Sequence, residues 1–367
     1  MSEKVDILIV GAGAAGVGVA LALHRLGLKF LIVERYGIGA SFRHWPRETR
    51  FITPSFTANA FGLPDLNALN PETSPAFTLG KEHPSGLDYA RYLEALVEHY
   101  KLRVENGTEV THVEARPEGF RVETRRGLLE ARFVVWATGE FQFPQALFPG
   151  SELGLHYGQI RRWTALEGEE FVVIGGYESG LDAAYHLTRL GKRVVVLDPA
   201  APWEKQTGEP SQDVSPYTRE RLWQAQATGR LELRRARVRQ LRAQNGHYRL
   251  VLPRGHLLAP TIPILATGFG GGFEPVQHLF EWNGASPILR EESDESTLAP
   301  GLFLVGPKVN HRSTAFCFVY KFRSRFPVVA SAIAKRLGVD SSPLEPYREQ
   351  GMWAENLARC CTSGCVC

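Results

Sequence analysis

The pattern of apolar and polar positions divides the chain into apolar runs and helical stretches. Residues 5–10 form a continuous apolar run, which leads through a glycine-rich turn into a helical stretch at 17–26. A second apolar run at 29–33 ends on Glu34. Continuous apolar runs of this length are typical of strands buried on both faces in a parallel sheet. The pattern therefore predicts a β-α-β unit near the start of the chain.

The same pattern returns in the second half of the chain. An apolar run at 171–174 enters a glycine turn at 175–180, a helical stretch at 181–190 and a further apolar run at 193–197. In addition, an apolar run ending in Ala-Thr-Gly occurs twice, at 133–139 and at 262–268. Internal self-similarity of this kind predicts two structurally related domains.

The first turn carries the residues that a dinucleotide requires. Gly11 permits a tight turn, Gly13 lets the backbone approach a pyrophosphate, and Gly16 allows the helix to pack closely on the strand. The N-terminus of the helix offers unpaired N–H groups to the phosphates. Glu34 follows some twenty residues later and can accept hydrogen bonds from ribose hydroxyls. We therefore predict a dinucleotide site here.

This loop, the two Ala-Thr-Gly motifs and the apolar run at 302–306 resemble the two-dinucleotide-binding-domain flavoproteins, a group that includes thioredoxin reductases, bacillithiol-disulfide reductases and flavin-containing monooxygenases. The resemblance extends to about residue 340. It implies an α/β fold with two Rossmann-like domains of three ββα layers, the second inserted into the first. It implies FAD in the first domain, with contacts from Gly11, Gly13, Ala14, Ala15, Gly16, Glu34, Arg35, Ser41, Trp45, Val110, Ala137, Thr138, Gly139, Gly306, Pro307 and Thr314.

Two of these contacts depend on the end of the first domain. Relatives have an aspartate where Pro307 stands, so that contact with the ribityl chain is lost or supplied elsewhere. Thr314 begins a predicted closing helix over 314–337, kinked at Pro327, whose N-terminus would point at the flavin. The basic residues Lys321, Arg323 and Arg325 on this stretch are predicted to form a solvated or interdomain face.

The resemblance also sets domain limits. We predict an FAD-binding domain over 1–152 and 285–345, an NAD(P)-binding-like domain over 153–284 and a flexible cysteine-rich tail over 346–367. In the second domain the implied nicotinamide-dinucleotide contacts are Gly175, Tyr177, Glu178, Ser179 and Asp198.

One residue of the second loop departs from the family pattern. Tyr177 replaces its second glycine, which places a side chain where the pyrophosphate needs backbone contact. Whether the domain binds a nicotinamide is therefore open. If it does, Asp198 favours NADH over NADPH.

Three further features are assigned from the local sequence. Residues 88–100 have helical periodicity, with Asp88 as the expected N-cap. The alternation over 119–133 predicts a β-meander. His156 is expected to be a structural residue of the linker.

The C-terminal tail carries four crowded cysteines: Cys360, Cys361, Cys365 and Cys367. Three interpretations compete. The tail could be a redox arm that passes electrons by thiol–disulfide exchange, a thiolate site for Zn or Cu(I), or a tail without chemistry. No metal ligand set is firm, and these cysteines are the candidate catalytic residues.

Composition limits the remaining function classes. The chain has 367 residues, a formal charge of +3 and no basic block, so we expect no nucleic-acid partner. No apolar run approaches the length of a membrane span and no signal peptide is recognised, which predicts a cytoplasmic protein without a membrane partner. The oligomeric state stays open, a homodimer being one option.

The function hypothesis is an FAD-dependent oxidoreductase that passes electrons from NADH or NADPH to a small-molecule or small-protein thiol or disulfide, or to a thiol-bound metal, through the tail cysteines. The alternatives are a flavin-dependent monooxygenase of a small substrate, and a flavoprotein sensor or metal carrier with a non-functional nicotinamide site.

Overall fold

The computed structural model describes residues 3–56, 64–145, 148–312, 314–355 and 357. The chain forms two compact units. The first comprises Met1–Arg43, Pro54–Glu140 and Gly271–Cys367, and the second comprises His44–Thr53 and Phe141–Gly270. The chain thus passes between the units four times. The passages at 140–141 and 270–271 precede the predicted boundaries at 152 and 284, and residues 44–53 belong to the second unit.

The first unit is built on a ten-stranded sheet with the strand order β15-β16-β17-β18-β6-β1-β2-β3, to which β4 and β5 are added beside β6. Ile9 in the central strand pairs with Ile32 on one side and Val135 on the other, and all three are fully buried. Burial on both faces explains the continuous apolar runs of the sequence. The strands of this unit are β1 Glu3–Val10, β2 Phe30–Glu34, β3 Val104–Asn106, β4 Val110–Arg116, β5 Gly119–Thr124, β6 Gly127–Trp136, β15 Glu281–Asn283, β16 Ser286–Arg290, β17 Glu295–Ser296 and β18 Leu302–Leu304, with β19 Asn310–His311 and β20 Thr314–Ala315 as a separate pair.

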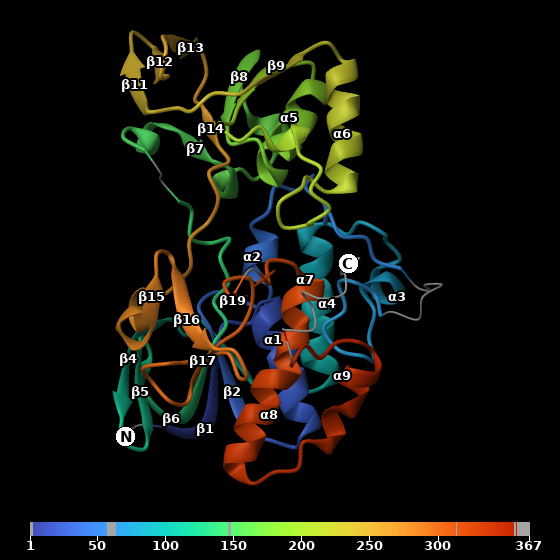
Figure 1. The fold of residues 1–367 in the computed structure, drawn as a ribbon, viewed down its shortest axis with the longest axis vertical. Coiled ribbons are helices and arrows are strands. Elements are labelled where there is room, and N and C mark those ends of the chain that lie inside the picture. Colours follow the sequence, from blue (N-terminus) through green and yellow to red (C-terminus); the bar gives the residue numbers. More distant parts are fainter. Residues whose placement is uncertain (1–2, 57–63, 146–147, 313, 356, 358–367) are drawn as a thin grey trace. The chain divides into compact units, whose positions relative to one another are not determined.

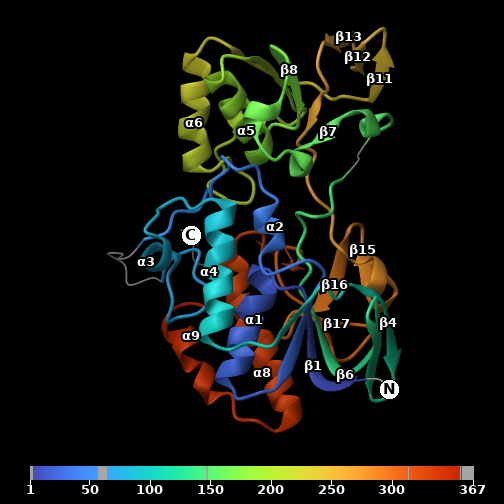
Figure 2. The ribbon, with the colours of Figure 1, turned by 180° about the vertical axis from the view of Figure 1, so that it is seen from behind.

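Helices cover one face of this sheet, and α1, α4 and α8 lie together there in both views (Figures 1 and 2). Helices α1 and α8 pack closely at Gly18: a Cβ on this residue would lie only 2.0 Å from the Phe326 ring. The antiparallel strands β4, β5 and β6 form the predicted β-meander. The helices are α1 Ala14–Arg25, α2 Ala40–Arg43, α3 Pro75–Leu79, α4 Gly86–His99, α7 Val319–Phe322, α8 Phe326–Leu337 and α9 Glu345–Glu349.

The predicted closing helix over 314–337 is wrong in its first part. Thr314 pairs with His311 in the β19–β20 hairpin, and helical structure begins only at Val319. Pro327 lies in the first turn of α8 and does not kink a continuous helix. A proline is tolerated there because the first N–H groups of a helix have no partner within it.

Asp88 is not the N-cap of α4. Ser85 occupies that position, its side chain accepts from the Asp88 N–H, and the Asp88 carboxylate accepts from the Ser85 N–H in return. This reciprocal capping box places the acid three residues after the cap.

The prediction of a solvated or interdomain basic face at the end of the first unit is also wrong for two of its three residues. Arg325 is fully buried, and its guanidinium donates to both carboxylate oxygens of Asp294 at 2.7 and 2.9 Å. Arg323 is buried as well and donates to the carbonyls of Asp65 and Ala68. Burial is possible because these acceptors satisfy the guanidinium groups.

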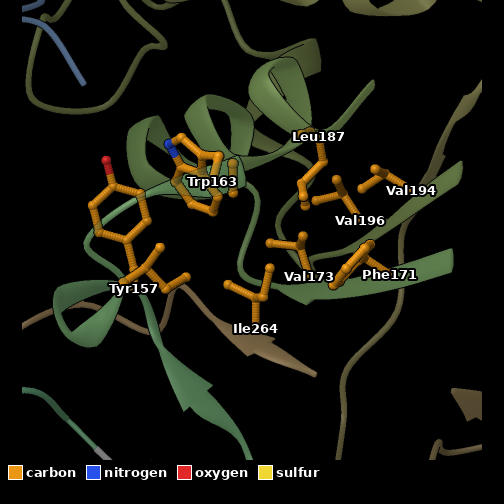
Figure 3. Close-up of a cluster of buried hydrophobic side chains, with 11 residues drawn as sticks. Tyr157, Trp163, Phe171, Val173, Leu187, Val194, Val196 and Ile264 are labelled. Carbon is orange, nitrogen blue, oxygen red and sulfur yellow. The ribbon is translucent and has the colours of Figure 1, made fainter. Parts of the chain in front are cut away.

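The second unit has a smaller parallel sheet with the order β10-β9-β8-β14-β7, and a separate antiparallel sheet of β11, β12 and β13. Its core is a cluster of apolar side chains between the parallel sheet and α5, including Val173, Val196, Leu187 and Ile264 (Figure 3). Its elements are β7 Leu155–His156, β8 Glu170–Ile174, α5 Glu178–Arg189, β9 Arg193–Leu197, α6 Pro216–Ala227, β10 Leu231–Arg234, β11 Gln240–Gln244, β12 His247–Val251, β13 His256–Ala259 and β14 Ile264–Leu265.

His156 fits the structural role expected of it. The imidazole is buried, Nδ1 accepts from the Gly158 N–H, and Nε2 lies 3.0 Å from the Gly268 carbonyl oxygen. Burial lowers its pKa.

Among the described residues, no helix combines the length and the apolar character needed to cross a bilayer.

The buried pair of Asp294 and Arg325 generates a first prediction. Asp294→Asn keeps a residue that tolerates the left-handed backbone found there (φ 58°) but leaves Arg325 without a countercharge. We expect a loss of about 3–5 kcal/mol in the free energy of unfolding, measured by urea denaturation. Glu130→Gln, which breaks an exposed pair with Lys4, is the control and should cost less than about 1 kcal/mol. Equal losses of stability in the two variants would contradict the conclusion that Asp294 neutralises a buried charge on Arg325.

Candidate functional site

The turn after β1 depends on a glycine that approaches a neighbouring strand. Gly11 has φ +108°, and a Cβ there would lie 2.6 Å from the carbonyl oxygen of Ala137, at the end of β6. A Cβ on Gly16 would lie 1.8 Å from the carbonyl oxygen of Gly11. Only glycine fits either position, so the turn and the helix are fixed against the sheet.

The second glycine of this turn is free of such contacts. Gly13 is the N-cap of α1 with ordinary φ −85°, and a Cβ there would meet nothing within 4 Å. The helix has no side-chain cap and no acid in its first turn. Its N-terminus therefore has neither a side-chain cap nor a carboxylate to satisfy its first N–H groups, and such a helix end can bind a phosphate.

Glu34 ends β2 at the same edge of the sheet. The carboxylate is buried, and its two oxygens accept from the backbone N–H groups of Ala12 and Tyr36 at 2.8 and 2.9 Å. Each oxygen retains a lone pair that can accept from a ribose hydroxyl. The next residue, Arg35, lies over the Tyr36 ring and pairs with Glu109.

The ends of β6 and β18 complete this edge. The two strands are parallel neighbours, with Leu304 opposite Trp136. Gly139, after β6, has φ +68° and no atom near a hypothetical Cβ, while Gly306, after β18, has φ +107° and lies against Ala15. The residues present fit a dinucleotide such as FAD, with its pyrophosphate at the α1 N-terminus.

The remaining residues implied for FAD are spread over several elements. Ser41 lies in α2, Val110 begins β4, Pro307 follows Gly306, and Thr314 lies in β20. Trp45 belongs to the second unit, where its ring is 5.0 Å from the Phe51 ring and 6.2 Å from the Phe141 ring.

The loop of the second unit repeats the geometry of the first. Gly175 has φ +103°, and a Cβ there would lie 2.2 Å from the carbonyl oxygen of Ala266. A Cβ on Gly180 would lie 1.9 Å from the carbonyl oxygen of Gly175. The Gly176 N–H donates to Asp198 Oδ2 at 2.8 Å, as the corresponding N–H of the first loop donates to Glu34.

Tyr177 takes the place of the second glycine without backbone strain. Its φ of −90° and ψ of −162° are close to the −85° and −169° of Gly13. The ring packs against the cluster of Leu181, Val214 and Leu222, and the hydroxyl donates to the Asp213 carbonyl at 2.7 Å. The side chain is thus held by the segment that precedes α6.

Glu178, the first residue of α5, also turns toward α6. Its carboxylate accepts from the Ser215 N–H at 2.6 Å and from the Thr218 hydroxyl at 2.5 Å. Burial raises its pKa. Because Ser215 caps α6, this acid serves the neighbouring helix, and α5 itself has no side-chain cap. Ser179 follows in the first turn of α5.

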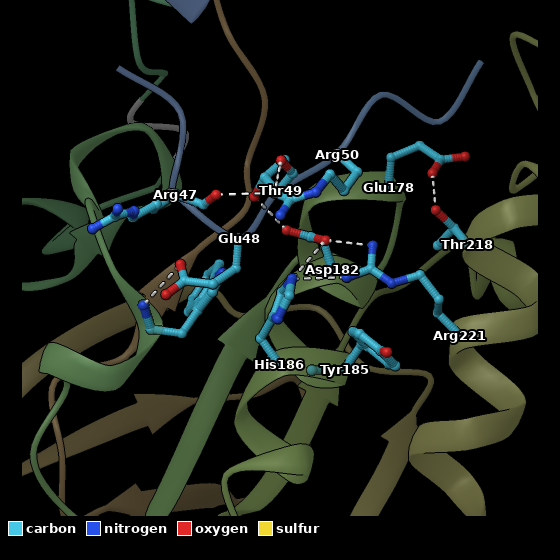
Figure 4. Close-up of polar contacts among 12 residues, drawn as sticks. Arg47, Glu48, Thr49, Arg50, Glu178, Asp182, Tyr185, His186, Thr218 and Arg221 are labelled. Atoms are coloured by element: carbon cyan, nitrogen blue, oxygen red, sulfur yellow. Dashed lines mark hydrogen bonds and ion pairs between the residues drawn. The ribbon is translucent and has the colours of Figure 1, made fainter. Parts of the chain in front are cut away.

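A buried polar network beside α5 was missed from the sequence. Asp182 accepts from the hydroxyls of Thr49 and Tyr157 at 2.7 Å and from Arg221 at 2.6 Å, and His186 lies 3.4 Å away (Figure 4). The spacing of Asp182 and His186, four residues apart on one helix face, is the signal that could have indicated it. A cavity of about 320 Å³ lies beside this network, lined by Glu48, Arg50, Tyr185, His186, Tyr217, Glu220, Arg221 and Gln224.

The candidate redox and metal residues of the tail cannot be placed. Cys360, Cys361, Cys365 and Cys367 lie outside the described residues. Within the ranges that the structure describes, no group of three or more His, Cys, Asp or Glu side chains is arranged to hold a metal ion.

Comparison with known proteins gives one family match. The family model described as "Pyridine nucleotide-disulphide oxidoreductase" matches residues 8–306. A ferredoxin–NADP reductase of a Bradyrhizobium species is 26% identical over 327 residues, which cover 83% of this chain and 84% of the relative. The uncharacterized oxidoreductase CzcO of Bacillus velezensis is 26% identical over 201 residues, so the match spans 52% of this chain and 54% of that protein.

Solved structures show the same fold. The bacillithiol disulfide reductase Bdr (YpdA) from Staphylococcus aureus aligns with a TM-score of 0.74 at 20% sequence identity, covering 91% of this chain and 99% of that chain. This likeness concerns the fold alone.

The first loop generates a prediction about cofactor binding. Gly13→Ala should leave the stability of the apoprotein unchanged, since the added Cβ meets no protein atom. It should weaken FAD binding by about 1–3 kcal/mol, roughly fivefold to 150-fold, because the Cβ projects into the space needed by the pyrophosphate. FAD affinity is measured by titration of the apoprotein. Gly37→Ala, with no atom within 4 Å of its Cβ, should change neither quantity.

The Asp182 network generates a prediction about pH. Burial would raise the pKa of the Asp182 carboxyl, but His186, Arg221 and Thr49 outweigh burial and hold the pKa well below its ordinary value of 3.8. Its stabilising contribution is therefore complete above about pH 4 and is lost as the pH falls further. Asp182→Asn should lower the free energy of unfolding of the second unit at neutral pH. Between pH 4 and pH 3 the variant should lose less stability than the wild type, because it has no carboxylate to protonate at this position. Chemical denaturation at pH 7, 4 and 3 tests this, with the exposed Glu167→Gln as control.

Proposed function

Because the chain belongs to the pyridine nucleotide-disulphide oxidoreductase family, we propose that it is an FAD-dependent oxidoreductase that takes electrons from a nicotinamide dinucleotide and delivers them to a disulfide or another thiol-bound acceptor. Family membership and the two α/β units confirm the family resemblance and the two-domain α/β fold expected from the sequence, whereas the flexible cysteine-rich tail stays a prediction. The acceptor, the site residues and a cytoplasmic location are part of the proposal.

The observation that carries this proposal is the repetition of one loop in both units. Gly11 and Gly175 make the same close approach to a strand-end carbonyl, and each following N–H donates to an acid at 2.8 Å. Two loops of this kind suit an enzyme that binds two dinucleotides, one as resident cofactor and one as reductant.

In the first unit the α1 N-terminus would hold the FAD pyrophosphate, and Glu34 would accept from the adenosine ribose. Bound FAD supplies the two-electron redox chemistry that protein side chains lack. In the second unit the α5 N-terminus and Asp198 would hold the nicotinamide dinucleotide. A carboxylate at the ribose favours free hydroxyls over a 2′-phosphate, so NADH is the preferred reductant.

The overall reaction balances for a disulfide acceptor. The dihydronicotinamide gives up two electrons and one hydrogen as a hydride equivalent, and one further proton comes from solvent. The disulfide bond is broken and two thiols form. The tail cysteines are the proposed relay to the acceptor, since a cysteine pair can accept the electrons as a disulfide and pass them on by exchange.

Anaerobic titration of the purified holoprotein with NADH and then NADPH tests the donor. We expect NADH to bleach the flavin absorbance, and NADPH to do so with an efficiency lower by about tenfold or more, because the Asp198 charge opposes the added phosphate. If neither reagent bleaches the flavin, the second unit does not serve as a nicotinamide site and the sensor or carrier hypothesis gains support.

A second measurement identifies the acceptor class. With a disulfide substrate and without oxygen, two thiols should appear for each NADH consumed, and protein truncated after Arg359 should lose this turnover while its flavin is still reduced by NADH. A separate aerobic assay tests the alternative: if the truncated protein consumes NADH and oxygen, places an oxygen atom in a small substrate and forms no thiols, the monooxygenase hypothesis replaces the disulfide-reductase hypothesis.

A further inference from the structure

One aromatic residue, Trp203, lies in the short 3-10 turn Pro202–Glu204 after β9 and contacts the second loop. A Cβ on Gly176 would lie 2.3 Å from Trp203 Cζ3 and 3.0 Å from the Asp198 Cβ. The indole edge, the loop backbone and the acid therefore meet at one corner. In the first loop the matching residue is Ala12, which carries a Cβ and is fully buried. The absence of a side chain at Gly176 is what allows Trp203 to stand there.

The indole is held in this position from several directions. Ala201 precedes it in a left-handed backbone conformation (φ 47°, ψ 59°) although it is not glycine, and it is fully buried. Such strain persists only where the surroundings enforce it, and it tends to occur at ligand sites. The ring packs against the buried cluster of Leu181, Val214 and Leu222, and Arg219 donates to the Trp203 carbonyl.

The acid at this corner has its outward lone pairs free for a ligand. Asp198 Oδ2 accepts from Gly176 and Oδ1 accepts from Ala200, and each carboxylate oxygen can accept a further bond. An adenosine ribose bound by this carboxylate would bring its 2′ oxygen to the corner that Trp203 occupies.

A 2′-phosphate at this corner would need room and positive charge. The indole takes up room beside the carboxylate. Arg235, just beyond β10, donates to Glu204 at 2.7 Å and so is already paired with an acid. Arg235 lies near the corner because the next residue, Ala236, donates its backbone N–H to the Asp198 carbonyl.

We propose that Trp203 is a specificity-determining residue of the second unit. It fills the space beside Asp198 that a 2′-phosphate would require, so the unit takes dinucleotides with a free 2′-hydroxyl. The inference rests on the proposed function of the second unit as a nicotinamide-dinucleotide site, and it adds a steric contribution from Trp203 to the charge of Asp198.

The test compares two probes that differ only in the 2′-phosphate: ADP-ribose and 2′-phospho-ADP-ribose. Their affinities for the FAD-loaded protein are measured by isothermal titration calorimetry. The wild type should prefer ADP-ribose. Trp203→Ala should reduce this preference by about tenfold through tighter binding of the phosphorylated probe, a change in the range that one side chain can impose. Trp223→Ala removes an exposed tryptophan of α6 in the same unit and should leave the preference unchanged.

The outcomes separate this inference from the proposed function. If the wild type binds neither probe, the second unit is not a dinucleotide site and both fail. If the wild type prefers ADP-ribose, but Trp203→Ala leaves the preference unchanged or weakens both probes equally, only the role of Trp203 is overturned. Trp203→Leu gives the same test should the alanine variant not fold. Asp198→Asn measures the contribution of charge separately and should relax the preference with Trp203 intact.

Discussion

The architecture depends on one close contact, made once in each unit, between a strand-to-helix turn and the carbonyl at the end of the adjacent parallel strand. Gly11 approaches Ala137 and Gly175 approaches Ala266 at distances that leave no room for a Cβ. Each contact brings the uncapped N-terminus of a helix to the carboxyl edge of a sheet. An acid at the end of the next strand then reaches the same edge. The anion site and the ribose site thus follow from a single steric constraint.

The two copies differ in what surrounds them rather than in their backbone. The first loop is bordered by open space at Gly13, whereas the second is bordered by α6 and the segment before it. Tyr177 and Glu178 satisfy that segment through their side chains while the backbone keeps the dinucleotide-loop conformation. Tyr177, the departure that left nicotinamide binding open in the sequence, packs its side chain against the segment before α6.

Local patterns predicted the parts of the fold that local interactions determine. The apolar runs, both glycine loops and the acids Glu34 and Asp198 lie where the sequence indicated. The residues whose environment was predicted wrongly interact with partners that the local sequence pattern does not indicate. Arg325 looked solvated because nothing near it in sequence neutralises it, yet Asp294 does so in the fold. The closing helix begins late because Thr314 pairs across a hairpin with His311, which helical periodicity cannot reveal.

Buried charge is found where segments distant in sequence must meet. Arg325 joins Asp294 in the first unit, and Asp182 joins Arg221 and Thr49 in the second. Removing two charges from water costs several kcal/mol per ion, so such pairs add little net stability, but a misaligned alternative would leave a charge unpaired and cost more. In the second unit, residues 44–53 lie between two segments of the first unit in the sequence. The cost of leaving the Asp182 carboxylate unsatisfied favours the hydrogen bond that holds this segment against α5 through Thr49. The buried aspartates therefore specify which distant segments join each unit, a choice that the glycine loops alone do not make.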